Sequence, residues 1–388
     1  MLINELPDDC LLTIFDYVNY LDDLVNCFKV CGKWSHLIAQ RTKKVKYLLG
    51  KIQMFYLYPE YDDCVYYRDI KQIDGTDLST EFPNLIISYK LEQEEKRKHN
   101  FALARNQEPS QGSINSHHGL IEKYRFQLKK VSCDLFEPNI QHESSSVKQL
   151  FRVESLDRFK KDAHLFPNLE RINVFNCCGR DSMYDGPVLE KLKIAEFAFM
   201  TTLFLGNEAS YAFQFMDSCP NLQSAHFITN SSHLFFDGTL KHESLQDLVI
   251  SAVNTISSIF NPRSIDWNDL KRLLMKYPNL KHLALWRQSN ITDEHIEELV
   301  HILPNLVLLD VCGCLSVSCK AAKYVQDYCK RYGRTIKFYF NGNYNEIDSD
   351  WPLLSSKQEI ISQGLDFMKH CFLKDFLDLP YFLIPIDD

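Results

Sequence analysis

This sequence lacks the features that place a protein in a membrane or outside the cell. No apolar run approaches the ~20 residues that a helix needs to span a bilayer, since even Ala195 to Gly206 is short and holds Glu196. The opening residues Met1 to Glu5 have neither the basic region nor the long apolar region of a secretory leader. The 13 cysteines are odd in number and scattered, which predicts free thiols in a reducing compartment. We therefore expect a soluble protein of the cytoplasm or the nucleus, with no membrane partner.

An excess of positive charge is also absent. The chain has 43 Lys and Arg against 51 Asp and Glu, a formal charge of -8. Binding to phosphate groups needs concentrated Lys and Arg, so this composition argues against a nucleic-acid partner. The early basic run Arg41 to Lys46 is expected to be a solvated helix face.

Recognisable catalytic and metal-binding motifs are missing as well. The sequence has no glycine loop that would cradle a phosphate and no Ser or Cys in a known nucleophile motif. The pair His117–His118 stands in a polar stretch without neighbouring Cys or carboxylate ligands. The densest cysteine cluster lacks the paired two-residue gaps of a zinc site, and we expect its thiols to be packed structurally: Cys312, Cys314, Cys319 and Cys329. These absences predict a protein that is not an enzyme and uses no cofactor or metal.

What the sequence does contain begins with an apolar stretch from Leu6 to Ile38, which predicts three short helices. Pro7 suits a first helical turn. Asp22 or Asp23 can cap a second helix, and Gly32 can end that helix before a third turn. Roughly 40 residues bury too little surface to fold alone without a metal, disulfides or a partner. The surplus of large apolar side chains therefore implies a covering protein surface, either a partner or the following domain of the same chain.

This stretch contains the following residues at characteristic mutual spacings: Leu6-Pro7, Leu11-Leu12, Ile14-Phe15, Val18, Asp23-Leu24, Val30-Cys31 and Trp34. In these residues it resembles the F-box, the motif that docks substrate receptors onto the Skp adaptor of cullin-based ubiquitin ligases. The departures are mild, with Asp9 where the family often has Glu and Val18 where it often has Leu. The resemblance implies three helices, binding to the Skp adaptor and, through it, to a cullin. It also implies a set of adaptor-binding residues: Leu6, Pro7, Leu11, Ile14, Phe15, Val18, Leu24, Val30, Cys31 and Trp34.

The rest of the chain divides by composition. We expect an F-box at residues 1–45, a joint with a first degenerate repeat at 46–91, and a mobile loop at 92–119, where a charge run precedes a polar segment that cannot bury a core. A repeat region is expected at 120–343 and a C-terminal cap or tail at 344–388.

A repeated motif identifies the central region. Pro-Asn-Leu recurs at Pro83, Pro167, Pro220, Pro278 and Pro304, and degenerate copies begin at Pro187 and Glu243. The six copies after Pro83 each open the pattern Leu-x-x-Leu-x-Leu, with apolar positions at Leu169, Ile172, Val174; Leu189, Leu192, Ile194; Leu222, Ala225, Phe227; Leu245, Leu248, Ile250; Leu280, Leu283, Leu285; and Leu306, Leu309, Val311. Further strands are expected at 128–133, 147–153 and 334–340, with helices at 266–277 and 292–303.

This pattern resembles the leucine-rich repeat, and its best copies resemble the cysteine type. The resemblance implies an α/β fold: a three-helix F-box followed by an irregular leucine-rich-repeat solenoid, with a parallel sheet on the concave face and helices on the convex face. Strand residues that alternate with the core leucines would face the concave side. The candidate target-binding residues are Arg171, Asn173, Phe175, Lys191, Lys193, His226, His282, Trp286 and Asp310.

Two of these positions are expected to need a covering group, which the C-terminal segment could supply. Trp286 and Phe175 are large aromatics on an expected exposed sheet, so a target or the chain's own tail should cover them. A possible helix at 356–379 and the apolar run Tyr381 to Ile386 follow the repeats. This ending can cap the exposed end of the solenoid or fold back along its concave face.

Together these features predict an F-box protein with leucine-rich repeats, which holds an unknown target protein for an SCF-type cullin ubiquitin ligase. The alternative is a protein-interaction scaffold without ubiquitin function, whose N-terminal helices are only a cap.

Overall fold

The structure is a computed structural model. It describes residues 3–50, 64–67, 87–89, 130–132, 144–153, 155–176, 183–199, 209–229, 231, 233–252, 264–354, 359 and 361–384. The expected loop at 92–119, with His117 and His118, lies outside the described residues, as does most of the joint at 46–91. The chain forms two compact units, Met1–Phe151 with Leu165–Asn168, and Arg152–His164 with Leu169–Asp388. Each is described by itself.

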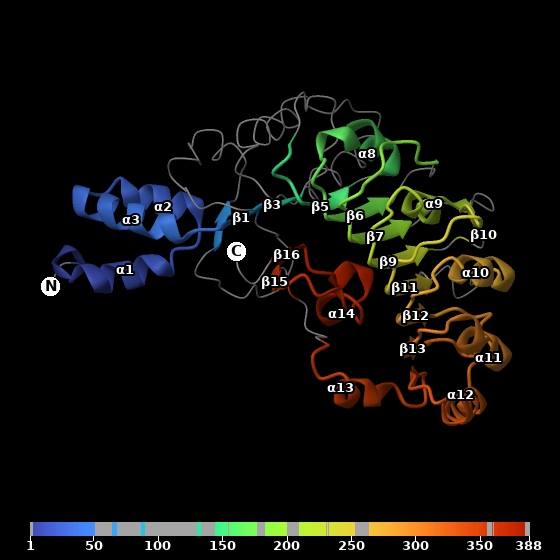
Figure 1. The fold of residues 1–388 in the computed structure, drawn as a ribbon. Coiled ribbons are helices and arrows are strands. Elements are labelled where there is room, and N and C mark those ends of the chain that lie inside the picture. Colours follow the sequence, from blue (N-terminus) through green and yellow to red (C-terminus); the bar gives the residue numbers. More distant parts are fainter. Residues whose placement is uncertain are drawn as a thin grey trace, which may run out of the picture. The chain divides into compact units, whose positions relative to one another are not determined.

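The first unit begins with the three expected helices. After a 3-10 turn at Ile3–Glu5 come α1 (Asp8–Asp16), α2 (Leu21–Phe28) and α3 (Gly32–Lys44). Pro7 immediately precedes α1, and its carbonyl accepts the amide of Leu11 at 3.1 Å. The three helices, which are drawn in blue in Figure 1, bury an apolar core between them.

Three expectations about these helices are corrected. Gly32 begins α3 and does not end α2, and α3 is the longest of the three. Asp22 and Asp23 lie in the first turn of α2 and not at its cap, where they favour the positive helix end. Arg41 is fully buried and not solvated, because its guanidinium reaches the side chains of Asp16 (3.6 Å) and Asn19 (3.2 Å).

The first unit continues as parallel strands. In spatial order they are β5 (Gln149–Val153), β4 (Lys130–Ser132), β3 (Ile87–Tyr89), β1 (Tyr47–Gly50) and β2 (Cys64–Tyr67). The strands expected at 128–133 and 147–153 are thereby confirmed.

The second unit is a parallel sheet in which most strands are followed by a helix on one face. Its strands, in spatial order, are β6 (Arg171–Asn176), β7 (Ile194–Phe199), β9 (Ser224–Thr229), β11 (Asp247–Ala252), β12 (His282–Trp286), β13 (Leu308–Asp310) and β14 (Lys337–Tyr339). A separate pair is formed by β8 (Ala209–Ser210) and β10 (His233–Leu234). The helices are α8 (Leu156–Asp162), α9 (Ala212–Met216), α10 (Trp267–Leu274), α11 (Asp293–Ile302) and α12 (Cys319–Tyr332). A 3-10 turn at Ala163–Leu165 follows α8.

The ends of three helices in this unit follow recognisable capping residues. The carboxylate of Asp266 accepts the amides of Asn268 and Asp269 at the start of α10. Thr292 and His295 form a reciprocal capping box at the start of α11. Helix α12 ends at Gly333, whose positive φ of 63° suits a residue without a side chain. The two helices expected at 266–277 and 292–303 are confirmed.

The asparagines of the Pro-Asn-Leu motif tie each segment to an earlier one. In each case the side-chain amide donates to a main-chain carbonyl 23 to 36 residues back: Asn168 to Ser145, Asn221 to Glu190, Asn279 to Glu243, and Asn305 to Pro278. This recurring bond gives the repeated motif a structural purpose, because it satisfies the backbone of a turn that carries no sheet partner.

The strand register confirms most of the repeat pattern and corrects one copy. One register row runs across the sheet and is buried throughout: Ile172, Ala195, Ala225, Leu248, Leu283, Leu309 and Phe338. The second copy therefore reads Leu192, Ala195, Phe197. Ile194 lies on the other face of the sheet, where its register partner in β6 is Arg171. The pattern expected for this copy therefore begins three residues too early. In the structure β7 starts at Ile194, so Lys191 and Lys193 precede the strand.

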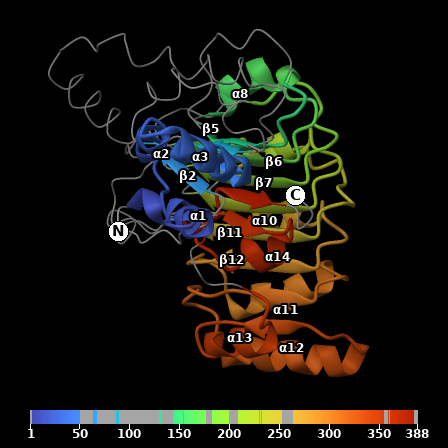
Figure 2. The same ribbon diagram turned by 90° about the vertical axis from the view of Figure 1, so that its left-hand side faces the viewer.

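The C-terminal segment, residues 344–384, does not form the helix expected at 356–379. A 3-10 turn at Tyr344–Glu346 leads into α13 (Ile347–Asp350). Its later described part holds β15 (Ile361–Gln363), α14 (Phe367–His370), a 3-10 turn at Phe376–Asp378, and β16 (Phe382–Ile384), which pairs with β15. Gly364, at a φ of +105°, interrupts helical geometry just before α14. Figures 1 and 2 show this segment on the sheet face opposite α10, α11 and α12.

Candidate functional site

Three of the expected adaptor-binding residues form the inside of the helical unit. Leu11, Phe15 and Leu24 are at most 2% exposed, so they hold the helices together and offer no surface to a partner. Trp34 is half-buried, and its ring packs edge-on against Phe15 with the centroids 5.1 Å apart. These four side chains therefore contribute to the packing of the three helices.

The other members of that set remain at the surface. Ile14 is 41% exposed and Val30 is 55% exposed. The remaining members are exposed or half-buried: Leu6, Pro7, Val18 and Cys31. Three further large apolar side chains, which do not belong to the expected set, are also exposed: Ile3 (49%), Tyr17 (73%) and Phe28 (39%). Tyr17 is the C-cap residue of α1 and Phe28 is the last residue of α2. A helix with apolar residues on most of its circumference leaves some of them without an internal partner.

Polar contacts fix the N-terminal turn that carries Leu6. The Lys33 ammonium donates to the main-chain carbonyls of Leu6 at 2.9 Å and Asn4 at 3.3 Å, and pairs with Asp8 at 3.1 Å. These contacts hold the turn against α3. The exposed apolar residues are thus presented by an ordered scaffold.

The second candidate surface, the strand face of the second unit, is covered by the C-terminal segment. The two form one apolar cluster in which strand residues contribute Ile194, Ala198, Val249, Ala284, Trp286, Leu308 and Tyr339, and the C-terminal segment contributes Ile347, Leu354, Phe367, Cys371, Phe372, Phe376, Leu379 and Leu383. Trp286 is 6% exposed in this cluster. The group that covers Trp286 is the chain's own tail.

A buried ion pair lies at one end of this covered face. Arg171 donates to both carboxylate oxygens of Glu196, with contacts of 2.7 and 2.9 Å, and neither side chain is more than 3% exposed. Asn173 donates to the same carboxylate at 2.8 Å. Arg171 also donates to the main-chain carbonyl of Pro380 at 2.7 Å. Arg171 therefore joins the sheet to the tail, while Asn173 helps to hold the Glu196 carboxylate within the sheet. The incorrect register expected for the second copy had hidden Glu196 as a member of this group.

His226 and Asp310 are both buried on this face. The Nε2 of His226 lies 2.9 Å from the carbonyl of Lys374, and its ring packs edge-on against Trp286 and Phe376. Burial lowers the pKa of His226 to about 4. Asp310 accepts from the indole of Trp286 at 2.8 Å, and burial raises its pKa to about 6.

The remaining candidates on this face also meet the chain itself. His282 pairs with Asp247 at 2.6 Å and packs against the rings of Trp351 and Phe372. Phe175 stacks on Phe376, with ring centroids 6.2 Å apart. Lys191 and Lys193 are exposed outside the strand, and Lys193 pairs with Glu170 at 3.7 Å. Of the nine candidates, these two lysines alone are exposed, and they lie off the strand face.

A second arginine also joins the covered face to the tail. Arg287 follows β12 at a φ of +56°, a conformation that non-glycine residues rarely adopt. Its guanidinium pairs with Asp375 at 2.9 Å and reaches the hydroxyl of Ser251 at 3.2 Å. The strained backbone thus serves the contact with the tail.

The structure offers few signs of other chemistry. Among the residues it describes, no group of three His, Cys, Asp or Glu is placed to hold a metal ion. The described cysteines carry free thiols, and Cys314 is buried with its Sγ 3.1 Å from the carbonyl of Leu285. No described helix has the length and apolar character to cross a membrane.

Comparison with known proteins identifies the helical part alone. The model of a family described as F-box-like matches residues 3–42, the span from the first 3-10 turn through most of α3. No curated protein matches the chain. The chain therefore carries an F-box-like domain, and its second unit is an α/β region with a parallel sheet.

Proposed function

We propose that this protein is a substrate-recognition subunit of an SCF-type cullin ubiquitin ligase. The F-box-like domain docks on the Skp adaptor, and the α/β region holds a target protein. The observation that carries the proposal is the set of large apolar side chains left exposed on an ordered F-box-like domain, with Tyr17 73% and Val30 55% exposed. Apolar surface presented on a rigid scaffold is typical of a docking site.

The mechanism in this proposal is proximity. A substrate receptor brings a target close to a separate enzyme that carries out the transfer, so its contribution is effective concentration and orientation. The chain then needs no nucleophile of its own. A location in the cytoplasm or nucleus is part of the same proposal, since that is where such a complex would act.

We further propose that the α/β region is a leucine-rich-repeat solenoid. The parallel register, the buried row from Ile172 to Phe338, and the recurring asparagine bonds support repeated units that stack on one another. The C-terminal segment covers the strand face, so a target could not contact the candidate residues there directly. A target would instead contact the outer surface of the C-terminal segment or another face of the region.

Co-expression with the Skp adaptor tests the docking part directly. The receptor proposal predicts co-purification in a stable complex, and loss of that complex when Ile14 or Val30 is replaced by Asp. Trp34 is a weaker choice of site, because its packing on Phe15 makes any substitution alter the core as well. A well-behaved monomer that never captures the adaptor would favour the scaffold alternative, in which the helices are only a cap.

A further inference from the structure

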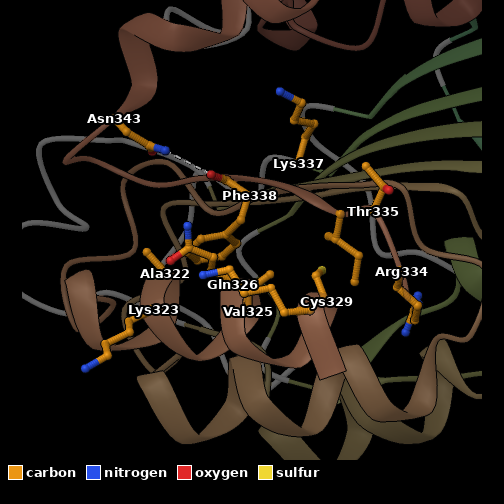
Figure 3. Close-up of a pocket in the computed structure, with 12 residues that line it drawn as sticks. Ala322, Lys323, Val325, Gln326, Cys329, Arg334, Thr335, Lys337, Phe338 and Asn343 are labelled. Carbon is orange, nitrogen blue, oxygen red and sulfur yellow. Dashed lines mark hydrogen bonds between the residues drawn. The ribbon is translucent and has the colours of Figure 1, made fainter. Parts of the chain in front are cut away.

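The edge strand β14 and the neighbouring helix α12 form a basic hollow at the end of the sheet. It lies between α12 and β14 and has a volume of about 620 Å³. In Figure 3 the ring of Phe338 and the side chain of Val325 occupy the middle, while Lys323 and Lys337 extend outward at its margins. Cavities of this size are typical of ligand sites in proteins.

The charge of this region is opposite to that of the whole chain. Six Lys or Arg residues and one Asp lie between Cys319 and Tyr339, a formal charge of +5 in a chain of -8. Four cationic residues line the hollow and no carboxylate does: Lys323, Lys330, Arg334 and Lys337. Such a local excess attracts an anionic partner.

Most of this charge is not neutralised by the protein. Among the described residues, Lys337 alone of the four forms an ion pair, with Asp350 at 2.9 Å. The Arg334 guanidinium donates to the main-chain carbonyls of Val300 and Leu303, which are neutral acceptors at the end of α11. Its positive charge is therefore held in place at the hollow but not cancelled.

The free edge of β14 is already partly occupied. The strand pairs with β13 alone among the described strands. The Asn343 amide donates to the Phe338 carbonyl at 3.0 Å and accepts the Phe340 amide at 3.0 Å. This side chain takes the hydrogen bonds that an added strand would use. A partner would consequently be held by side-chain charges and not by extension of the sheet.

We propose that this basic hollow binds an acidic peptide segment, rich in Asp and Glu, of the target protein. The charge complementarity selects the partner. The floor, where Val325 and Phe338 are 2% and 9% exposed, offers little apolar contact, so the carboxylates supply most of the binding. This inference rests on the proposed receptor function for the statement that the peptide belongs to a target; acidic-peptide binding itself is measured independently.

The test is a fluorescence-anisotropy titration of the full-length chain with a short fluorescein-labelled Glu-rich peptide. We expect Lys323→Glu with Lys330→Glu to weaken binding roughly tenfold or more, and the corresponding Gln substitutions to weaken it less. Both lysines are exposed, so folding should survive. The control exchanges two other exposed lysines, Lys161→Glu with Lys369→Glu, and should change the affinity less than about threefold.

Three results would overturn the proposal. The first is equal affinity of the double Lys323 and Lys330 variant and the unaltered chain. The second is equal binding of a peptide in which Gln replaces every Glu. The third is that a single-stranded oligonucleotide binds more tightly than the Glu-rich peptide and that its binding depends on the same lysines. That result would assign the hollow to nucleic acid. Adaptor capture, measured on the same preparations, distinguishes this failure from failure of the receptor function, because the F-box-like domain lies in the other unit.

Discussion

The guanidinium of Arg171 donates a 2.7 Å hydrogen bond to the carbonyl of Pro380, 209 residues later in the chain. The same guanidinium holds the buried carboxylate of Glu196. One side chain therefore neutralises a charge on the sheet and fixes the tail that covers the sheet. The strand face and the C-terminal segment are accordingly one folded structure, with a shared apolar core.

Removing Arg171 should be costly for that reason. Arg171→Ala leaves the carboxylate of Glu196 buried without its partner, and we expect the free energy of unfolding to fall by about 3–5 kcal/mol. Urea unfolding followed by tryptophan fluorescence measures the change. The double variant Arg171→Met with Glu196→Gln removes both charges and should lose less than the single variant. A double variant as unstable as Arg171→Ala would show that the buried charge is not the cause.

The tail should contribute to stability through its buried ring and not through its exposed neighbour. Phe376 is 4% exposed and Leu377 is 60% exposed. Phe376→Ala should lower the free energy of unfolding by about 3 kcal/mol, because it opens a cavity between Phe175 and His226. Leu377→Ala should change it by less than about 0.5 kcal/mol. Equal effects in chemical denaturation would mean that the tail is not packed as described.

The sequence predicted the elements well because their signals are local. Asp266 and Thr292 start α10 and α11 through bonds to the next residues of the chain, and the leucine pattern marks each strand. The phase of one strand was wrong because Leu189, Leu192 and Ile194 satisfy the pattern as well as Leu192, Ala195 and Phe197 do. Only pairing with a neighbouring strand decides between such registers.

The tail could not be predicted because its partners are distant in sequence. Phe367 to Leu379 holds apolar residues at spacings that a helix also shows, and the sheet residues that they pack against are spread over the chain from Ile194 to Tyr339. The buried Arg41 illustrates the same limit, since a basic run suggests solvent until Asp16 and Asn19 are placed beside it. In the F-box-like domain, composition identified the apolar residues, but not that Leu11 and Phe15 point inward while Ile14 points outward.

Asp310 should make the protein less stable as the pH rises. Burial raises its pKa to about 6 from 3.8, so the folded state favours the protonated form. The free energy of unfolding should therefore fall as the pH rises from about 4 to about 6, and stay lower above that range. Asp310→Asn removes this dependence. Its melting temperature relative to the unaltered chain should be higher at about pH 8 than at about pH 4.5. A melting-temperature difference that is the same at about pH 4.5 and about pH 8 would contradict the raised pKa of Asp310. Loss of the bonds to Trp286 and Cys312 shifts both melting temperatures alike and does not affect this comparison.

His226 should act in the opposite direction over an overlapping range. Burial lowers its pKa to about 4 from 6.5, so the unfolded chain binds a proton that the folded chain excludes. The resulting stability is present above about pH 6.5 and is lost as the pH falls toward about 4. His226→Gln should gain stability relative to the unaltered chain on acidification, as measured by the same melting curves. A relative loss on acidification would indicate that the imidazole is stabilised in its charged form.

The F-box-like domain gives the sharpest test of adaptor docking through two neighbouring residues of α1. Ile14 is an exposed apolar residue at 41%, and Thr13 is an exposed polar residue whose hydroxyl donates to the carbonyl of Asp9. Ile14→Asp places a charge where the proposed partner would bury a methyl group, and should weaken adaptor capture by at least tenfold, about 1.4 kcal/mol. Thr13→Asp introduces the same charge one position away and should leave capture within about threefold. Circular dichroism of both variants checks that the helices persist. If Ile14→Asp remains folded and captures the adaptor as well as Thr13→Asp does, the exposed face of α1 is not the docking surface, and the helices return to the role of a cap.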